Sequence, residues 1–106
     1  STTVNRAAGL NLTKALAQEL AGDGILVNAV NIGCVKTPQW ANIHAKRAPE
    51  KSAEEFFADL AADEIPLARF GKPDEVSGIV AFLAGDRAGY ITGASIDVAG
   101  GMGRYT

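Results

Sequence analysis

The chain has 106 residues, of which 47% are hydrophobic and 21% are charged, a composition that excludes a generally disordered protein. Ten basic residues against twelve acidic ones give a formal net charge of −2, which excludes the strongly basic footprint of a nucleic-acid-binding domain. A single cysteine and a single histidine exclude a zinc site of the common Cys/His kind, and we expect no bound metal.

Further features of the sequence bear on the cellular compartment and on whether the chain is part of a longer one. The longest stretch without charge, residues 24–35, is too short and too polar to cross a membrane. One cysteine forms no internal disulfide, which favours the cytoplasm. The chain begins at Ser1 and enters a helical pattern almost at once. We therefore expect a processed chain or a piece of a longer one, with residues 1–106 forming a single partial domain.

The first predicted element is a helix over residues 3–21. Its polar residues Asn11, Lys14 and Gln18 recur every three to four positions and form one narrow stripe on an otherwise apolar surface. An apolar surface that wide predicts burial on two sides. The helix is expected to end at the glycine-rich residues 22–24.

Residues 25–30 are β-branched and almost entirely apolar, which predicts a strand buried on both faces, as in a parallel sheet. Three helices follow. Thr37 as N-cap starts one over residues 38–46, and the capping box of residues 52–55 opens another that runs to about residue 62. Pro73, with two acidic residues after it, starts the third, which ends at Gly85.

Residues 94–98 predict a second and last strand, so that helices and strands alternate as in an α/β protein. Two strands seldom form a stable sheet by themselves. Because the first strand is predicted to be apolar on both faces, it is typical of an interior strand that lacks one of its neighbours.

Five segments carry a recognisable pattern, namely residues 6–17, 23–38, 69–76, 80–84 and 90–101. Together, and in this order, they resemble the C-terminal half of the short-chain dehydrogenase/reductase family, over about residues 2–101. The resemblance implies the C-terminal portion of a Rossmann-type, doubly wound parallel sheet, with a long helix, the last two strands and a helical substrate lid over residues 37–64. The glycine-rich phosphate loop of the family does not occur in this sequence.

The resemblance places Thr2 and Arg6 where the family has its catalytic tyrosine and, four residues later, the lysine that lowers the tyrosine's pKa. Both residues depart from the pattern. A threonine hydroxyl does not ionise near neutral pH, and an arginine keeps the positive charge with a different shape. The alternative interpretation is that both are ordinary surface residues at the start of a helix.

The family's cofactor loop corresponds to residues 32–37, where Gly33, Val35 and Thr37 match the pattern and Ile32 replaces a proline. The resemblance implies that Gly33 lets the backbone approach the nicotinamide ring and that the Val35 main chain pairs with the carboxamide. It also implies that the Thr37 hydroxyl donates to NAD or NADP. For Thr37 a plain helix cap is the alternative, and the two roles are compatible.

Trp40 and His44 lie four residues apart and share one face of the first lid helix. In the family that face lies over the pocket for a small-molecule substrate, so either is a candidate for substrate contact. Packing between the helices is the alternative. Cys34 is expected to be a buried filler, since no adjacent base marks it as a nucleophile.

Two functions remain open at this point. The chain is either part of a short-chain NAD(P)-dependent oxidoreductase, inactive by itself because the cofactor needs a complete fold, or a non-catalytic remnant that acts as an oligomerisation or binding module. In both cases we expect partner chains, either further copies of this chain or a complementary N-terminal half. The expected contacts are the helix face with Leu10 and Ala17 and the last strand.

Overall fold

The computed structural model describes residues 2–102, apart from the side chains of Thr2, Thr3 and Arg6. The elements are α1 (Thr2–Leu20), β1 (Ala29–Ile32), α2 (Pro38–Arg47), α3 (Ala53–Glu64), α4 (Pro73–Ala84) and β2 (Ser95–Val98), with 3-10 turns at Ala21–Asp23 and Asp86–Ala88. The predicted helices and the last strand are confirmed to within two residues at each end.

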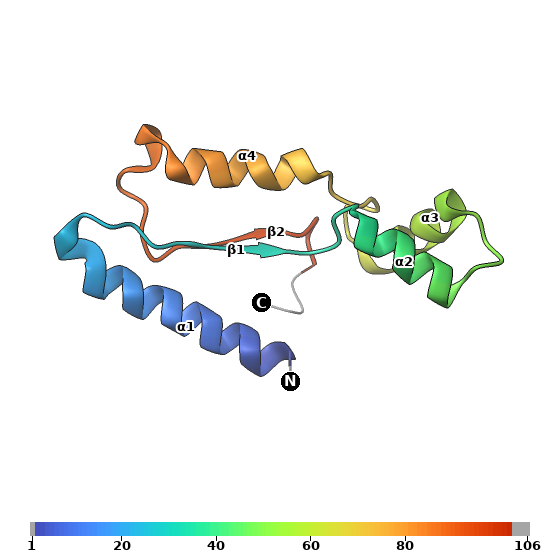
Figure 1. The fold of residues 1–106 in the computed structure, drawn as a ribbon, viewed down its shortest axis with the longest axis horizontal. Helices are drawn as coiled ribbons and strands as arrows, with labels where there is room; N and C mark the ends of the chain where they lie inside the picture. The colour runs from blue at the N-terminus through green and yellow to red at the C-terminus, as the bar shows by residue number, and fades with distance from the viewer. Residues whose placement is uncertain (1, 103–106) are drawn as a thin grey trace.

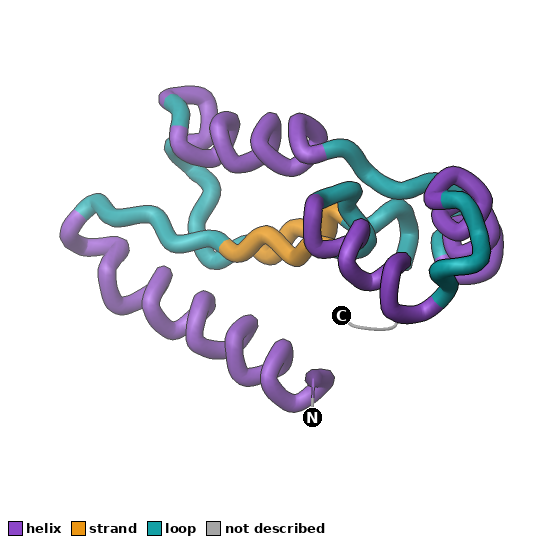
Figure 2. Tube along the Cα trace, turned by 45° about the vertical axis from the view of Figure 1, so that its right-hand side comes forward, coloured by secondary structure: helices purple, strands orange, loops and turns teal. Residues whose placement is uncertain are grey.

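The two strands pair in parallel, with Ala29 opposite Ser95 and Ile32 opposite Val98. Helices α1 and α4 lie on opposite sides of the pair, and α2 and α3 project beyond the carboxyl ends of the strands (Figure 1). The turned view in Figure 2 keeps the same layers. The α/β arrangement with a helical lid at the carboxyl end of the sheet is therefore confirmed.

The first strand begins later than expected, at Ala29 and not at residue 25. The reason lies in the segment before β2, where Gly93 takes a φ of +76° and turns the backbone out of an extended path. Before Ala29, the Asn28 side chain joins the two segments where strand pairing does not. Its Nδ2 donates to the Ile91 carbonyl at 3.1 Å, and its Oδ1 accepts from the Ala94 amide at 2.9 Å. Asn28 therefore ties together the two segments that lead into the sheet.

The expectation that the first strand is buried on both faces is wrong for the described structure. Ile25, Leu26 and Ile32 are 48%, 41% and 47% exposed. On one face Asn31 donates to Ser95 Oγ at 2.7 Å and to Asp97 Oδ1 at 2.9 Å, so that face is polar where the strands pair. No described element covers the apolar side chains in full, which explains their exposure.

The core lies at the junction of the lid and the strand ends. Its buried members are Ala61, Ile65, Phe70 and Met102, with Cys34, Trp40, Phe57, Leu60 and Ala99 packed against them. The radius of gyration is 16.6 Å, against about 13 Å for a compact domain of this length. The long helices therefore extend away from the core and do not enclose it.

The long helix α1 meets the rest of the chain near its carboxyl end. Ala17 is 2% exposed, and its Cβ lies close to Gly93, where an added Cβ atom would stand 3.4 Å away. Val4 and Leu12, nearer the amino end, are 64% and 59% exposed. Within residues 2–102, no helix combines the length and apolar character that crossing a membrane requires.

We predict that Asn28→Ala lowers the free energy of unfolding by about 1–3 kcal/mol, because it leaves a half-buried carbonyl and a half-buried amide without partners. Urea denaturation followed by circular dichroism measures the change. The control is Asn42→Ala on the exposed surface of α2. Equal effects of the two substitutions would contradict the role of Asn28 in joining the two segments.

Candidate functional site

The loop after β1 is fixed by backbone hydrogen bonds to two distant segments. The Gly33 amide donates to the Val98 carbonyl of β2 at 3.0 Å. The Gly71 amide donates to the Cys34 carbonyl at 2.9 Å, and the Lys36 amide donates to the Gly71 carbonyl at 3.0 Å. These bonds make Val35 and Gly71 an isolated parallel bridge. We call residues 33–36, with Val98 and Gly71, the three-segment junction.

Gly33 allows the closest approach in this junction. A Cβ atom added there would lie 2.8 Å from both Cα and Cβ of Ala99. A side chain at position 33 therefore forces the backbone of one segment to move. The glycine that sequence reasoning assigned to close approach of a cofactor is also required by packing inside the chain.

Val35 is 6% exposed, yet its main chain offers both a donor and an acceptor. The bridge to Gly71 uses the amide and carbonyl groups of the residues on either side of Val35, so its own N–H and C=O face the opposite way. Neither group has a hydrogen-bond partner among the residues that the structure describes. This adjacent donor and acceptor are complementary to a carboxamide, which offers a carbonyl acceptor beside an NH2 donor.

Thr37 occupies the N-cap position of α2 with extended backbone angles of −137° and 166°. The predicted N-cap position of Thr37 is confirmed, but its side chain makes no capping hydrogen bond. The amide of Trp40, the third residue of the helix, donates instead to the Thr37 carbonyl at 3.0 Å. The exposed Thr37 hydroxyl lies beside Val35 on one wall of a groove of about 560 Å³, and α4 residues form the other wall.

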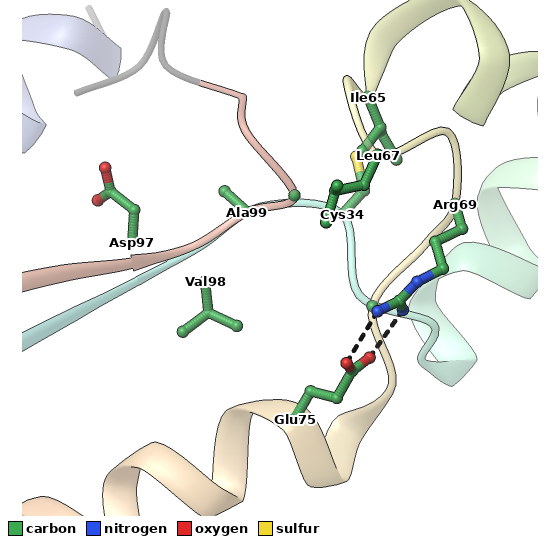
Figure 3. A pocket seen from close by; sticks show the side chains of 10 residues that line it. Cys34, Ile65, Leu67, Arg69, Glu75, Asp97, Val98 and Ala99 are labelled. Carbon is green, nitrogen blue, oxygen red and sulfur yellow. Dashed lines mark hydrogen bonds and ion pairs between the residues drawn. The ribbon is translucent and has the colours of Figure 1, made fainter.

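A second pocket, of about 180 Å³, lies where the strands end (Figure 3). Arg69 and Glu75 face each other across its mouth in a two-point ion pair, with nitrogen–oxygen distances of 2.8 Å and 2.9 Å. Asp97 points away from α4 and Val98 points toward it, as Figure 3 shows. The ion pair therefore closes the side of the pocket that faces the start of α4.

Glu75 has an unusually low pKa for a surface carboxyl group. The Arg69 guanidinium, together with the Lys72 amide that donates to Glu75 Oε1 at 3.0 Å, lowers the pKa of Glu75 from 4.5 to about 2. The carboxylate stands in the first turn of α4, where the helix dipole also favours negative charge. Glu75 thus links the loop of residues 69–72 to the helix that follows it.

Trp40 and His44 are placed in the aromatic cluster of the lid. The Trp40 ring meets Phe70 edge-on at 4.9 Å between centroids, and the His44 ring lies 5.1 Å from Phe56. The His44 Nε2–H donates to the Lys51 carbonyl at 2.7 Å, which ties α2 to the turn before α3. Both rings are therefore packing residues within this chain, and contact with a substrate stays a prediction.

The two predicted catalytic side chains, Thr2 and Arg6, lie outside the part of the structure that is described, although their backbones belong to α1. Within residues 2–102, no three His, Cys, Asp or Glu side chains are grouped closely enough to hold a metal ion. Of the seven predicted site residues, the structure brings Gly33, Val35 and Thr37 together in one loop.

Sequence reasoning missed the Arg69–Glu75 pair and the polar contact between Asn31 and Asp97. The first had a usable signal, because Glu75 stands two residues after Pro73 at the start of a helix, where a carboxylate reaches back to the preceding loop. The second had none, since residues 31 and 97 meet only through the strand register.

The sequence model of the enoyl-(acyl carrier protein) reductase family matches residues 1–103. The 3-oxoacyl-(acyl-carrier-protein) reductase FabG of Thermotoga maritima is 42% identical over 98 residues, and the acetoacetyl-CoA reductase of Shinella zoogloeoides is 44% identical over 97 residues. Each comparison covers 92% of this chain and 36% of the relative. The chain therefore spans about a third of the length of these curated relatives.

A similar solved structure is the NADPH-bound short chain oxidoreductase of Pseudomonas aeruginosa PAO1, a protein described as containing an atypical catalytic center. It has a TM-score of 0.78 at 39% identity, over 95% of this chain and 38% of that one. The likeness includes the arrangement of helices around the strand pair.

We predict that Gly33→Ala destabilises the chain by about 1–3 kcal/mol, because the new methyl group overlaps Ala99. The matched control is Gly78→Ala in α4, where an added Cβ meets nothing within 4 Å. That control is expected to stabilise the chain by about 0.5–1 kcal/mol, since alanine favours a helix. Chemical denaturation of both variants gives the comparison, and a harmless Gly33→Ala would refute the close approach.

A second prediction concerns pH. Because folding lowers the pKa of Glu75 from 4.5 to about 2, its contribution to stability is fully present above pH 4.5 and is lost as the pH falls toward 2. Glu75→Gln is expected to flatten that part of the stability curve, and Arg69→Gln to flatten it too. Urea midpoints across this range provide the measurement. A slope retained by both variants would contradict the ion pair.

Proposed function

The chain belongs to the short-chain dehydrogenase/reductase family, and we propose that it forms part of an NAD(P)-dependent oxidoreductase. The proposed reaction transfers a hydride between a nicotinamide and a carbonyl or alcohol group. Because the chain spans 36% of the relatives' length, the activity is proposed for the protein to which these residues contribute.

The observation that carries this proposal is the unpaired main chain of Val35. Val35 lines the groove, so a ligand there can pair both groups in place of water, and each such hydrogen bond contributes about 0.5–1.5 kcal/mol net. The carboxamide of a nicotinamide supplies the complementary acceptor and donor. Val35 is held against Gly71 on its other side, so the two groups are fixed in direction before any ligand arrives.

The neighbouring residues fit the same ligand. The Thr37 hydroxyl makes no bond to its own helix and is available to donate to a phosphate or carboxamide oxygen. Gly33 packs directly against Ala99, so the residues that follow it in the loop start from a fixed position. When bound, the nicotinamide supplies or accepts the hydride. The three residues of the chain orient it, and the lid helices α2 and α3 exclude water from the reacting face.

Reduction of a carbonyl also needs a proton at oxygen, and this part of the site departs from the family. A threonine hydroxyl at position 2 is able to donate a hydrogen bond, but a threonine does not ionise near neutral pH. Arg6 contributes positive charge that stabilises an oxyanion without releasing a proton. We infer that proton transfer is slow where these two residues face the substrate. A relative with an atypical catalytic center is consistent with such a departure.

For the substrate we propose a 3-oxoacyl thioester. Two similar proteins carry names that specify this class, one acting on acyl-carrier-protein thioesters and one on acetoacetyl-CoA. A binding or assembly module is the second candidate function. It is favoured by the large apolar side chains exposed along the molecule, which include Val4, Leu12, Ile32 and Val80.

The proposal predicts that Thr2→Tyr combined with Arg6→Lys raises NADPH-dependent reduction of acetoacetyl-CoA by about a hundredfold in the protein that carries this chain. The tyrosine supplies the missing proton, and the lysine lowers its pKa. Loss of NADPH absorbance measures the rate.

The matched control for this experiment is Thr3→Tyr with Arg6→Lys, which places the new phenol one residue away from the predicted position. A rate that is the same in both double variants would contradict the assignment of position 2. If neither variant nor the unaltered protein oxidises NADPH with any 3-oxoacyl thioester, the binding or assembly module becomes the better account.

A further inference from the structure

A third hollow, of about 350 Å³, lies between α3 and the loop of residues 68–72. Phe57 and Phe70 form its apolar wall, and Lys36 and Lys72 stand on its rim. Phe70 is 9% exposed and belongs to the core, so this wall is a fixed surface. We call this hollow the lysine pocket.

The backbone holds the two lysines side by side. Since Val35 is bridged in parallel to Gly71, the next residues along the two segments, Lys36 and Lys72, are neighbours across the bridge. Like charges at neighbouring positions of paired strands repel each other. Among the described residues, neither ammonium group has a carboxylate within ion-pair distance. The arrangement favours an anion that satisfies both groups.

The other charged residues that line the pocket do not neutralise the two lysines. Arg69 also lines it, but its guanidinium is occupied by Glu75. Lys72 acts on the same Glu75 carboxylate at longer range and helps to lower its pKa. Glu54, in the first turn of α3, is the carboxylate that lines the pocket itself. Two lysines therefore face one carboxylate.

The Lys36 ammonium already interacts with the aromatic wall, since its Nζ lies 5.2 Å from the centre of the Phe57 ring. This contact places the charge directly above the apolar surface. A ligand that fits both features has an anionic phosphate ester at one end and an uncharged flexible chain at the other. Inorganic phosphate would use only the lysines, and an alkyl chain only the rings.

We propose that the lysine pocket binds the phosphate of a phosphopantetheine arm, with the first part of the pantetheine chain against Phe57 and Phe70. This arm is common to coenzyme A and to acyl carrier proteins, so the choice of ligand rests on the proposed 3-oxoacyl thioester substrate. Lys36 belongs both to the pocket and to the cofactor loop of residues 32–37, so the two sites share the three-segment junction. Binding there anchors the thioester by its carrier end and leaves the reactive end free.

The direct test is titration of the chain with 4′-phosphopantetheine, followed by the fluorescence of Trp40. The chain has one tryptophan, and its ring touches Phe70 of the pocket wall at 4.9 Å between centroids. We expect saturable binding. Lys36→Gln and Lys72→Gln, each as a single substitution, are expected to weaken it about tenfold. Lys46→Gln on the exposed surface of α2 is the matched control and is expected to bind as the unaltered chain does.

Three further ligands test whether the phosphate is recognised and which carrier supplies it. Pantetheine, which lacks the phosphate, is expected to bind at least about tenfold more weakly. Coenzyme A and a phosphopantetheinylated acyl carrier protein are then compared, and the tighter ligand identifies the physiological carrier. Equal affinity for pantetheine and its phosphate, unchanged binding in both lysine variants, or no binding of any of these ligands would overturn the proposal.

A second measurement does not depend on fluorescence. The chain is acetylated with a soluble succinimidyl ester, with and without 4′-phosphopantetheine, and mass spectrometry gives the extent of acetylation at each lysine. We expect the ligand to protect Lys36 and Lys72, and Lys46 serves as the unprotected reference. The proposed function is tested separately with acetoacetyl-N-acetylcysteamine, a thioester without phosphate. If that compound is reduced while the lysines stay unprotected, the pocket assignment falls and the proposed function stands.

Discussion

The backbone of residues 33–36 is hydrogen-bonded to two other segments at once, and the arrangement of the candidate site follows from that constraint. Val98 fixes its beginning and Gly71 fixes its end, through bonds of 2.9–3.0 Å. Only glycine at position 33 allows the first contact, because a Cβ atom there would stand 2.8 Å from Ala99. Without this junction the loop after β1 would be more mobile, since loops move more than the elements they connect.

The three-segment junction presents different chemical groups on its two sides. On one side it leaves the N–H and C=O of Val35 buried and unpaired, beside a Thr37 hydroxyl that caps nothing. On the other side it sets Lys36 next to Lys72 over an aromatic wall. The first arrangement suits a carboxamide and the second suits a phosphate ester. A single bridge thus gives a physical reason for placing a cofactor contact and a substrate-carrier contact close together.

Local patterns in the sequence were sufficient for much of the fold. Pro38, Ser52 and Pro73 mark helix starts by their chemistry alone, and all three helices begin at or next to these residues. The start of β1 was misplaced because apolar character continues through Ile25 and Leu26, whereas pairing depends on a glycine turn and an asparagine contact more than sixty residues apart. The Lys36–Lys72 neighbourhood was equally hidden, since it depends on a bridge between distant loops. The resemblance identified Gly33, Val35 and Thr37, but not the reason that the Val35 main chain is unpaired.

Amide hydrogen exchange of the folded chain, resolved residue by residue, tests the junction most directly. The account predicts that the Gly33, Lys36 and Gly71 amides exchange slowly and together, because each is hydrogen-bonded across segments. It predicts that the Val35 amide exchanges about tenfold faster than these neighbours, because it has no partner among the described residues. Equal protection of all four amides, or exchange of the first three as fast as that of Val35, would contradict it.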